Sequence, residues 1–491
     1  MTDETAPPFD LLIRGGTVVD GTRGERFGAD VGVRGGRIAA VGDLSAHAAQ
    51  RIIDATGKIV APGFIDSHTH DDRAVLADPD MICKISQGVT TVVTGNCGIS
   101  LAPLKPGAPR PMPLGLIAAE DDPAAAFERF ADYMAALRNT PPAVNVAPMV
   151  GHTTLRVTAM SALDRAADPD EIATMKGLLT EALDAGAIGI STGTYYPPAA
   201  AAPTEEVIEV CRPLTGTGAV YATHMRNEAE RCIDSLNETF EIGRALDVPV
   251  VISHHKLQRE PNFGKSKLTL PLIHAAMRCQ CVALDYYPYN ASSTMLHTEE
   301  AKLQGRVRIA TCGSHPEAAG RELADIAAEW GVDRAEAARR LQPASAIYFS
   351  MDEGDVQNIL AFEETMIGSD GLPLGDKPHP RLWGSFPRVL GHYSRDLELF
   401  PLETAVWKMS GLTAKNFGLA ERGTIAVGNY ADLVVFDAAT IRDTATYDTP
   451  CEPATGVEAV IVNGTLTWWQ GAHQGARAGQ LIRRGRRDED A

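Results

Sequence analysis

The sequence predicts an α/β protein, and three observations support this. Through the middle of the 491-residue chain, short apolar segments alternate with helical patterns; the apolar segments end near residues 68, 97, 149, 191, 224, 254, 285 and 370. Both ends of the chain carry short strand patterns between glycine turns instead. The last two apolar segments end 85 positions apart, which leaves room for an insertion. Eight parallel strands with intervening helices are typical of a (β/α)8, TIM-like barrel.

The two ends of the chain predict a small β module. Strand patterns occupy residues 10–13, 17–20, 29–34, 37–41 and 51–54 at the start, and 423–429, 431–437, 457–462 and 465–469 at the end. Because both ends show the same pattern of short strands between turns, we expect one β-sandwich built from residues 1–61 and 416–480, next to a barrel of residues 62–415. The tail from Gly475 onward is expected to be mobile.

Capping signals locate several barrel helices. Residues 168–171, Asp-Pro-Asp-Glu, supply a cap, a first-turn proline and a third-position glutamate for a helix that stops at Gly186. Residues 227–246 and 266–279 fit two more helices. A βα unit usually needs about 30 residues, so the long interval after the seventh strand predicts a subdomain inserted at about 291–345. Its helical stretch, 316–341, should lie on the face where barrels keep their active sites.

Composition narrows the class of function. A net charge of -18 and a pI near 5.2 argue against nucleic acid or a membrane surface as partner. The N-terminus lacks the pattern of a signal peptide, and no apolar run approaches the ~18 residues that span a bilayer. Eight irregularly spaced cysteines fit reduced thiols. We therefore expect a cytoplasmic enzyme, whose oligomeric state the sequence does not indicate.

Metal-binding side chains gather at the ends of five predicted strands. His68 and His70 follow an apolar run at i, i+2 spacing, so both point to one face of an extended strand. Four later segments end in residues of similar chemistry: Cys97, His224, His254 and Asp370. Each has a plain structural alternative, such as a hydrogen-bonded histidine, a small buried cysteine or a helix cap. Because the carboxyl ends of barrel strands share one rim, their coincidence predicts a metal site.

The ligand types indicate zinc and a hydrolytic reaction. Imidazole and thiolate together suit zinc, and three protein ligands leave a position for water. Cys97 lies between Gly95 and Gly98, which allow a sharp turn that exposes the sulfur. Bound zinc generates a nucleophile from water at neutral pH and polarises a carbonyl group. Asp370 is expected to accept the proton and pass it to a leaving nitrogen, which implies amide hydrolysis.

Residues 189–193 form a competing motif, G-x-S-x-G, the nucleophile elbow of serine hydrolases. Asp370 and His392 follow it in a suitable order. The elbow requires a strand that feeds directly into a helix, whereas the sequence predicts no helix start until Thr204. The zinc hypothesis is therefore preferred.

The motifs together resemble the N-acyl-D-amino-acid deacylases, or D-aminoacylases, of the amidohydrolase superfamily. Matching segments run through most of the chain, at residues 63–72, 94–99, 189–196, 222–226, 253–256, 286–289 and 369–371. The resemblance implies Asp370 as catalytic acid and base. It implies one tightly held Zn²⁺ on Cys97, His224 and His254, and a second, weaker metal position at His68 and His70. It further implies that the substrate α-carboxylate is held by Lys256, Tyr287 and Arg381, with Tyr196 or Ser292 nearby.

Several alternatives stay open at this point. A surface ion pair is the plain alternative for Lys256 and for Arg381. Dihydroorotases and hydantoinases resemble the first strand, but usually carry a modified lysine at the end of strand four, and residues 187–196 contain no lysine. Hydrolysis of a cyclic imide or a dipeptide is the nearest rival reaction, and a non-catalytic interaction barrel is disfavoured by the intact ligand set. The preference for D substrates rests on the resemblance alone, and the preferred side chain and acyl group cannot be predicted.

Overall fold

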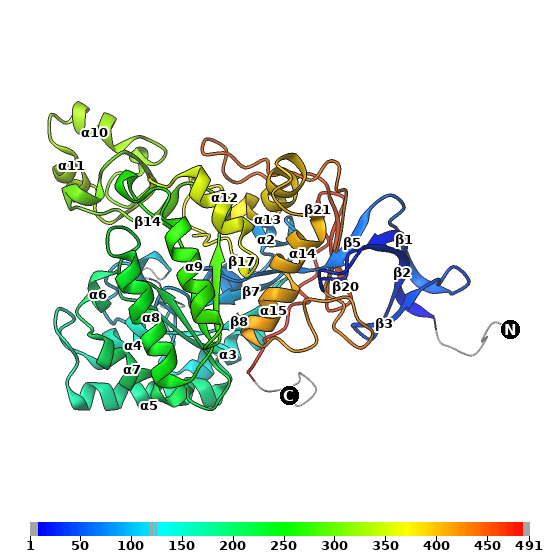
Figure 1. Ribbon diagram of the computed structural model, residues 1–491, viewed down its shortest axis with the longest axis horizontal. Coiled ribbons are helices and arrows are strands. Elements are labelled where there is room, and N and C mark those ends of the chain that lie inside the picture. Colours follow the sequence, from blue (N-terminus) through cyan, green and yellow to red (C-terminus); the bar gives the residue numbers. More distant parts are fainter. Residues whose placement is uncertain (1–7, 118–121, 123–124, 485–491) are drawn as a thin grey trace.

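A closed barrel of parallel strands surrounded by helices forms the centre of the molecule (Figure 1). The computed structural model describes residues 8–117, 122 and 125–484. Two hydrogen-bonded sheets supply the barrel, in the orders β6-β7-β8 and β9-β10-β11-β12-β13-β17. Their strands are β6 (Phe64–Asp66), β7 (Val89–Thr94), β8 (Asn145–Pro148), β9 (Val150–Gly151), β10 (Gly189–Gly193), β11 (Val220–His224), β12 (Val250–Ile252), β13 (Val282–Tyr286) and β17 (Thr365–Ile367).

The two sheets join on both sides and close the barrel. Only Met149 separates β8 from β9, so these two short strands occupy one position in the barrel. Between β17 and β6, Ser67 N donates to Ile367 O at 3.3 Å and Asp370 N donates to His68 O at 2.8 Å. The eight predicted strand ends fall within three residues of the observed ones. The prediction of a TIM-like α/β barrel is confirmed.

The helices around the barrel begin and end near their predicted caps. Helix α5 (Pro169–Ala185) has the full capping box at Asp168, and it ends at Gly186 in the left-handed region, with φ 107°. Helix α8 (Cys232–Leu246) starts later than predicted, because Asn227 Oδ1 accepts from two backbone N–H groups and closes a turn first. Helix α9 (Ser266–Met277) matches its prediction.

The other helices outside the inserted segment also pack around the strands. They are α1 (Ala74–Ala77), α2 (Ile82–Ile85), α3 (Phe130–Asn139), α4 (His152–Ala159), α6 (Pro197–Ala200), α7 (Thr204–Cys211), α12 (Glu353–Ala361), α13 (Arg381–Arg388), α14 (Leu402–Met409) and α15 (Gly411–Phe417). The short helix α6 starts before Thr204, so the prediction that no helix starts earlier is wrong.

Strands from both ends of the chain form one nine-stranded sheet beside the barrel (Figure 1). Its order is β21-β20-β19-β18-β5-β1-β2-β3, and β4 pairs with β1. The strands are β1 (Phe9–Val18), β2 (Phe27–Arg34), β3 (Arg37–Gly42), β4 (Ala49–Asp54), β5 (Ile59–Pro62), β18 (Leu433–Phe436), β19 (Val457–Val462), β20 (Thr465–Trp469) and β21 (Ala472–His473). Many of their buried side chains form a separate apolar cluster, whereas others, such as Val434 and Val460, belong to the large cluster of the barrel. The sandwich arrangement and the domain limits stay predictions.

Three details of these ends differ from the predictions. Residues 10–13 and 17–20 belong largely to one strand, β1, because an irregularity between Ile13 and Gly16 absorbs the glycines without breaking the pairing with β2. Residues 423–429 form turns rather than a strand. The tail is packed as far as residue 484, since Ile482 N donates to Val146 O at 2.8 Å, while residues 485–491 lie outside the described part.

The inserted segment forms a small antiparallel sheet, β14-β16-β15, with two helices beside it (Figure 1). Its elements are β14 (Ser292–Met295), β15 (Arg306–Cys312), α10 (Leu323–Glu329), α11 (Arg334–Arg340) and β16 (Ala344–Phe349). Gly331, with φ 65°, ends α10 and splits the predicted helical stretch. Within the described part of the chain, no helix is long and apolar enough to cross a membrane.

Candidate metal centre

Three of the candidate site residues have left-handed backbone conformations just past the ends of their strands. Along β11, Val220, Ala222 and His224 alternate with period two, so ordinary strand geometry points His224 inward. Cys97, His254 and Asp370 lie just past their strands, and their φ values are 53°, 34° and 47°. Such φ values are costly for residues with a side chain, and they cluster at functional sites.

The loop that carries Cys97 is held by hydrogen bonds and glycines. A Cβ on Gly95 would lie 2.1 Å from Met149 O, so only glycine fits there. Ser191 Oγ donates to Gly95 O and accepts from Gly98 N at 2.8 Å. The serine of the G-x-S-x-G motif is therefore buried and braces the Cys97 loop, which removes the support for a nucleophile elbow.

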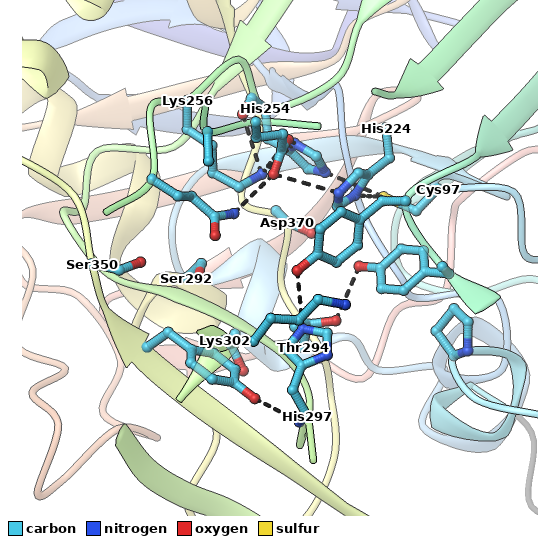
Figure 2. Close-up of a pocket in the computed structure, with 18 of the residues that line it drawn as sticks. Cys97, His224, His254, Lys256, Ser292, Thr294, His297, Lys302, Ser350 and Asp370 are labelled. Carbon is cyan, nitrogen blue, oxygen red and sulfur yellow. Dashed lines mark hydrogen bonds and ion pairs between the residues drawn. The ribbon is translucent and has the colours of Figure 1, made fainter. Parts of the chain in front are cut away.

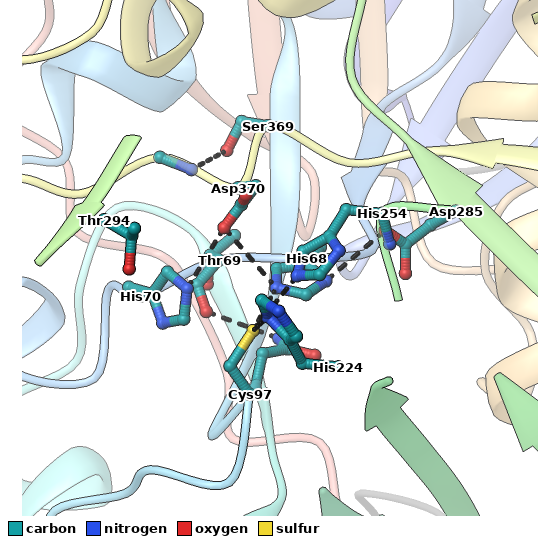
Figure 3. A network of polar contacts seen from close by, with 12 residues as sticks. His68, Thr69, His70, Cys97, His224, His254, Asp285, Thr294, Ser369 and Asp370 are labelled. Atoms are coloured by element: carbon teal, nitrogen blue, oxygen red, sulfur yellow. Dashed lines mark hydrogen bonds and ion pairs between the residues drawn. The ribbon is translucent and has the colours of Figure 1, made fainter. Parts of the chain in front are cut away.

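One buried thiol lies among three imidazole rings (Figure 3). Cys97 Sγ is 3.3 Å from His68 Nε2, 3.3 Å from His254 Nε2 and 3.6 Å from His224 Nδ1. A tetrahedral zinc ion with the usual bonds, about 2.3 Å to sulfur and about 2.0–2.1 Å to nitrogen, separates these atoms by about 3.5 Å. The donor types and their spacing therefore fit zinc.

The electrostatics of the cluster favour neutral imidazoles. Burial, followed by the charge of Lys256, lowers the pKa of His254 to about 3. Burial also lowers the pKa of His68 to about 3, although Asp370 opposes the shift. Both rings thus keep a lone pair for a cation at neutral pH. Burial and the Asp370 charge raise the pKa of the Cys97 thiol well above its usual value, so the thiolate needs a bound cation.

Asp370 lies beside this cluster and contacts both histidines of the first strand. Its Oδ1 is 3.1 Å from His70 Nε2 and 3.6 Å from His68 Nε2, and its Oδ2 is 2.9 Å from Arg381 Nη1. Burial would raise the pKa of Asp370, but Arg381 and His70 outweigh it and hold the pKa well below its usual value. The carboxylate is therefore ionised and able to accept a proton.

A cavity of about 220 Å³ opens onto the cluster (Figure 2). His70, Cys97, His224, His254 and Asp370 line it together with three of the predicted substrate-binding residues: Lys256, Tyr196 and Ser292. The inserted segment contributes β14 and His297 to the wall. Neither Tyr287 nor Arg381 occurs among the described residues that line the cavity. They lie behind Asp370, where the Arg381 guanidinium is 4.5 Å from the centre of the Tyr287 ring.

A family model described as "Amidohydrolase family" matches residues 51–264 and 289–467. The chain belongs to the amidohydrolase family. Over 484 residues this amidohydrolase is 60% identical to a D-aminoacylase of Alcaligenes xylosoxydans xylosoxydans, and the match covers 99% of each chain. The resemblance predicted from the motifs is thereby confirmed.

Two solved structures extend the comparison. A D-aminoacylase with a binuclear metal centre, for which one-metal activation and second-metal attenuation are described, is 61% identical to this amidohydrolase, with a TM-score of 0.95. An N-acyl-D-glutamate deacylase from Bordetella bronchiseptica, complexed with zinc and a phosphonate mimic of the tetrahedral intermediate, is 46% identical, with a TM-score of 0.93. Each match covers 97% of this chain and 100% of the other.

Two acidic residues that contact the candidate metal ligands of this amidohydrolase were not predicted from the sequence. Asp285 Oδ1 accepts from His254 N at 2.8 Å and lies 3.3 Å from His68 Nδ1. Glu228 lies 3.0 Å from His254 Nδ1 and 3.4 Å from His224 Nε2. Asp285 could have been noticed because it ends the predicted seventh strand. Glu228 follows His224 by four residues in a loop, where no regular period indicates which way a side chain points.

A buried lysine ties the first strand of the barrel to the last. Lys84 Nζ donates to Asp66 Oδ2 at 2.8 Å and to Ser369 Oγ at 2.9 Å, and it lies 3.2 Å from Asp71 Oδ2. Asp66 Oδ1 also accepts from Ser369 N at 2.7 Å. This network places the segment of His68 and His70 against the segment of Asp370.

Replacement of Lys84 by methionine should destabilise the amidohydrolase by about 3–5 kcal/mol, because it leaves two buried carboxylates without their cation. Chemical denaturation followed by circular dichroism measures the change. Lys267→Met, at an exposed position of α9, is the matched control and should change stability by less than about 0.5 kcal/mol. Equal stability of the two variants would show that the network contributes nothing to the fold.

Proposed function

We propose that this amidohydrolase hydrolyses the amide bond of N-acyl-D-amino acids, giving a D-amino acid and a carboxylate. The observation that carries the proposal is the Cys97 thiol among three imidazoles, with the ionised Asp370 carboxylate beside them at the floor of a cavity. Relatives that match nearly the whole chain are a D-aminoacylase and an N-acyl-D-glutamate deacylase, and they favour this reaction over cyclic imide or dipeptide hydrolysis.

The proposed metal ligands divide into two positions. Cys97, His224 and His254 hold one zinc ion tightly, and His68 with His70 form a second, weaker position. The distances support a shared cluster, since His68 Nε2 and His254 Nε2 both lie 3.3 Å from the sulfur. When bound, zinc supplies Lewis acidity toward a carbonyl group and makes a strong nucleophile available from water near neutral pH.

Asp370 is proposed to move the proton. Its Oδ1 faces the cluster and the cavity, and the carboxylate is ionised, so an oxygen is free to accept a proton from the attacking water. The same carboxyl group then donates that proton to the amine nitrogen as the C–N bond breaks. Arg381 keeps Asp370 ionised between turnovers, because it is a buried cation within 2.9 Å.

The substrate carboxylate is proposed to bind at the wall formed by Lys256, Tyr196 and Ser292. Lys256 supplies the cation, and the two hydroxyl groups, which also line the cavity, supply donors. Arg381 and Tyr287 lie one layer deeper. Their predicted contact with the carboxylate requires the guanidinium to turn from Asp370 toward the cavity when substrate enters.

The decisive experiment combines metal analysis with turnover of both enantiomers of N-acetylmethionine. We expect about one tightly bound zinc ion per chain and turnover of the D enantiomer. The kcat/KM of the L enantiomer should be at least about 100-fold lower, because its side chain and α-hydrogen exchange places in the cavity. A dipeptide and a cyclic imide serve as controls. Zinc-free protein, or equal turnover of both enantiomers, would overturn the proposal.

A further inference from the structure

One buried carboxylate contacts both histidines of the proposed tight zinc position. Glu228 Oε1 lies 3.0 Å from His254 Nδ1, and Glu228 Oε2 lies 3.4 Å from His224 Nε2. The same carboxylate accepts from Lys256 Nζ at 2.7 Å and from Gln258 Nε2 at 2.9 Å. Glu228 is almost fully buried, so the hydrogen bonds from Lys256 and Gln258 replace contact with water, while the two histidine nitrogens lie close to its free lone pairs.

The two imidazole rings present different nitrogens to the thiol. His224 faces Cys97 through Nδ1 and Glu228 through Nε2, whereas His254 faces Cys97 through Nε2 and Glu228 through Nδ1. A neutral imidazole that gives the lone pair of one nitrogen to a metal carries its proton on the other nitrogen. With zinc on the Cys97 side, both remaining N–H groups therefore point at Glu228.

The charges around Glu228 are consistent with an acceptor of this kind. The Lys256 cation lies 2.7 Å from Glu228 Oε1, a charge-assisted contact that favours the ionised carboxylate. Lys256 Nζ also lies 2.6 Å from His254 Nδ1. Two N–H donors at this distance repel each other, so in the proposed tautomer Lys256 Nζ shifts away from the ring while both groups keep Oε1 as their acceptor. The lysine cation on this side also disfavours a metal ion between Glu228 and the outer nitrogens.

We propose that Glu228 is a positioning residue for the metal centre, which accepts an N–H from His224 and from His254 at once. It thereby sets the tautomer and the tilt of both rings, although it is not itself a ligand of the proposed tight zinc position. Its hydrogen bond from Lys256 also connects these ligands to the residue proposed to hold the substrate carboxylate. This inference rests on the proposed function for the identity of the site. Loss of such a partner typically weakens metal binding by about 10–100-fold.

The test compares zinc affinity in Glu228→Gln and in the wild-type enzyme by competition with a chelator. The amide has nearly the shape of the carboxylate but can accept at only one of its two ends, so one histidine N–H faces an N–H. We expect the zinc dissociation constant to rise by about 10–100-fold. Cobalt-substituted enzyme should also show shifted ligand-field bands. Glu230→Gln is the control, because Glu230 is half exposed and pairs with Arg259 at the surface.

Wild-type zinc affinity and an unchanged cobalt spectrum in Glu228→Gln would overturn the inference. If that variant does not fold, nitrogen NMR of the wild-type zinc-loaded enzyme with labelled histidines decides instead. Protons on His224 Nε2 and His254 Nδ1 support the inference, and protons on neither or on only one overturn it. Failure of the proposed function is distinguishable, since it appears as absent turnover of N-acetyl-D-methionine in the wild-type enzyme whatever the ratio of zinc affinities.

Discussion

Asp370→Ala should retain the tightly bound zinc and lose most of its turnover. We expect kcat to fall by at least about 10²–10⁴-fold, the range that a positioned acid–base group contributes. The loss follows from the geometry, because Asp370 is the ionised carboxylate that faces the cavity from the end of β17. It is absent from the proposed tight zinc position, so the zinc content should stay near that of the wild type.

The measurements are kcat for N-acetyl-D-methionine and zinc content by mass spectrometry. Alanine leaves the buried Arg381 cation without its carboxylate, so Asp370→Asn is the companion variant that keeps the volume of the side chain. Asp376→Ala, at an exposed position six residues further along, is the matched control and should turn over normally. Loss of zinc in proportion to the loss of activity would mean that Asp370 is a metal ligand rather than the proton-transfer group.

Cys97→Ala should lose the tightly bound metal together with its activity. The thiol is the one sulfur donor of the described cluster, and its three imidazole neighbours lie within 3.6 Å. Removal of the thiol leaves only nitrogen donors for the tight position. We therefore expect zinc affinity to fall by more than the roughly 10–100-fold caused by loss of a residue that only hydrogen-bonds to a ligand. Activity should disappear at zinc concentrations that saturate the wild-type enzyme.

Zinc affinity by chelator competition checks this expectation directly. The variant should still fold, because alanine removes a single buried atom, and circular dichroism provides that check. Cys451→Ala is the control, since its thiol is exposed and distant in sequence from every strand end of the barrel. Retention of zinc by Cys97→Ala at wild-type affinity would show that His68, His224 and His254 form the primary cage without sulfur.

The sequence predicted the barrel and the candidate ligands well because both depend on local patterns. Apolar runs of three to six residues mark the strands, and His68, His224 and Asp370 each stand at or just past the end of one. Helix α5 followed from its capping box for the same reason, since a cap involves only neighbouring residues. The terminal β1 was divided incorrectly, because a bulge that absorbs two glycines depends on the partner strand.

The supporting residues of the site could not be predicted from the sequence. Glu228 reaches two histidines from a loop, and Arg381 lies under Asp370 instead of on the cavity wall, and neither placement has a periodic signature. Lys256 lies beside His254, although β12 ends at Ile252 and the strand spacing does not extend to either residue. The sequence also did not show that its ammonium group pairs with Glu228. Such contacts depend on how separate loops meet above the barrel.

The sequence by itself determined the strand positions, the helix caps and the chemistry of the ligand set, because these depend on residue types and spacings within one element. The tertiary structure alone decided that Cys97 lies equally close to His68 and His254 and that Arg381 keeps Asp370 ionised. It also decided that Ser191 holds the Cys97 loop by hydrogen bonds and is not a nucleophile. Barrel closure brings together side chains that are up to 300 positions apart, and burial then determines which of them carry charge.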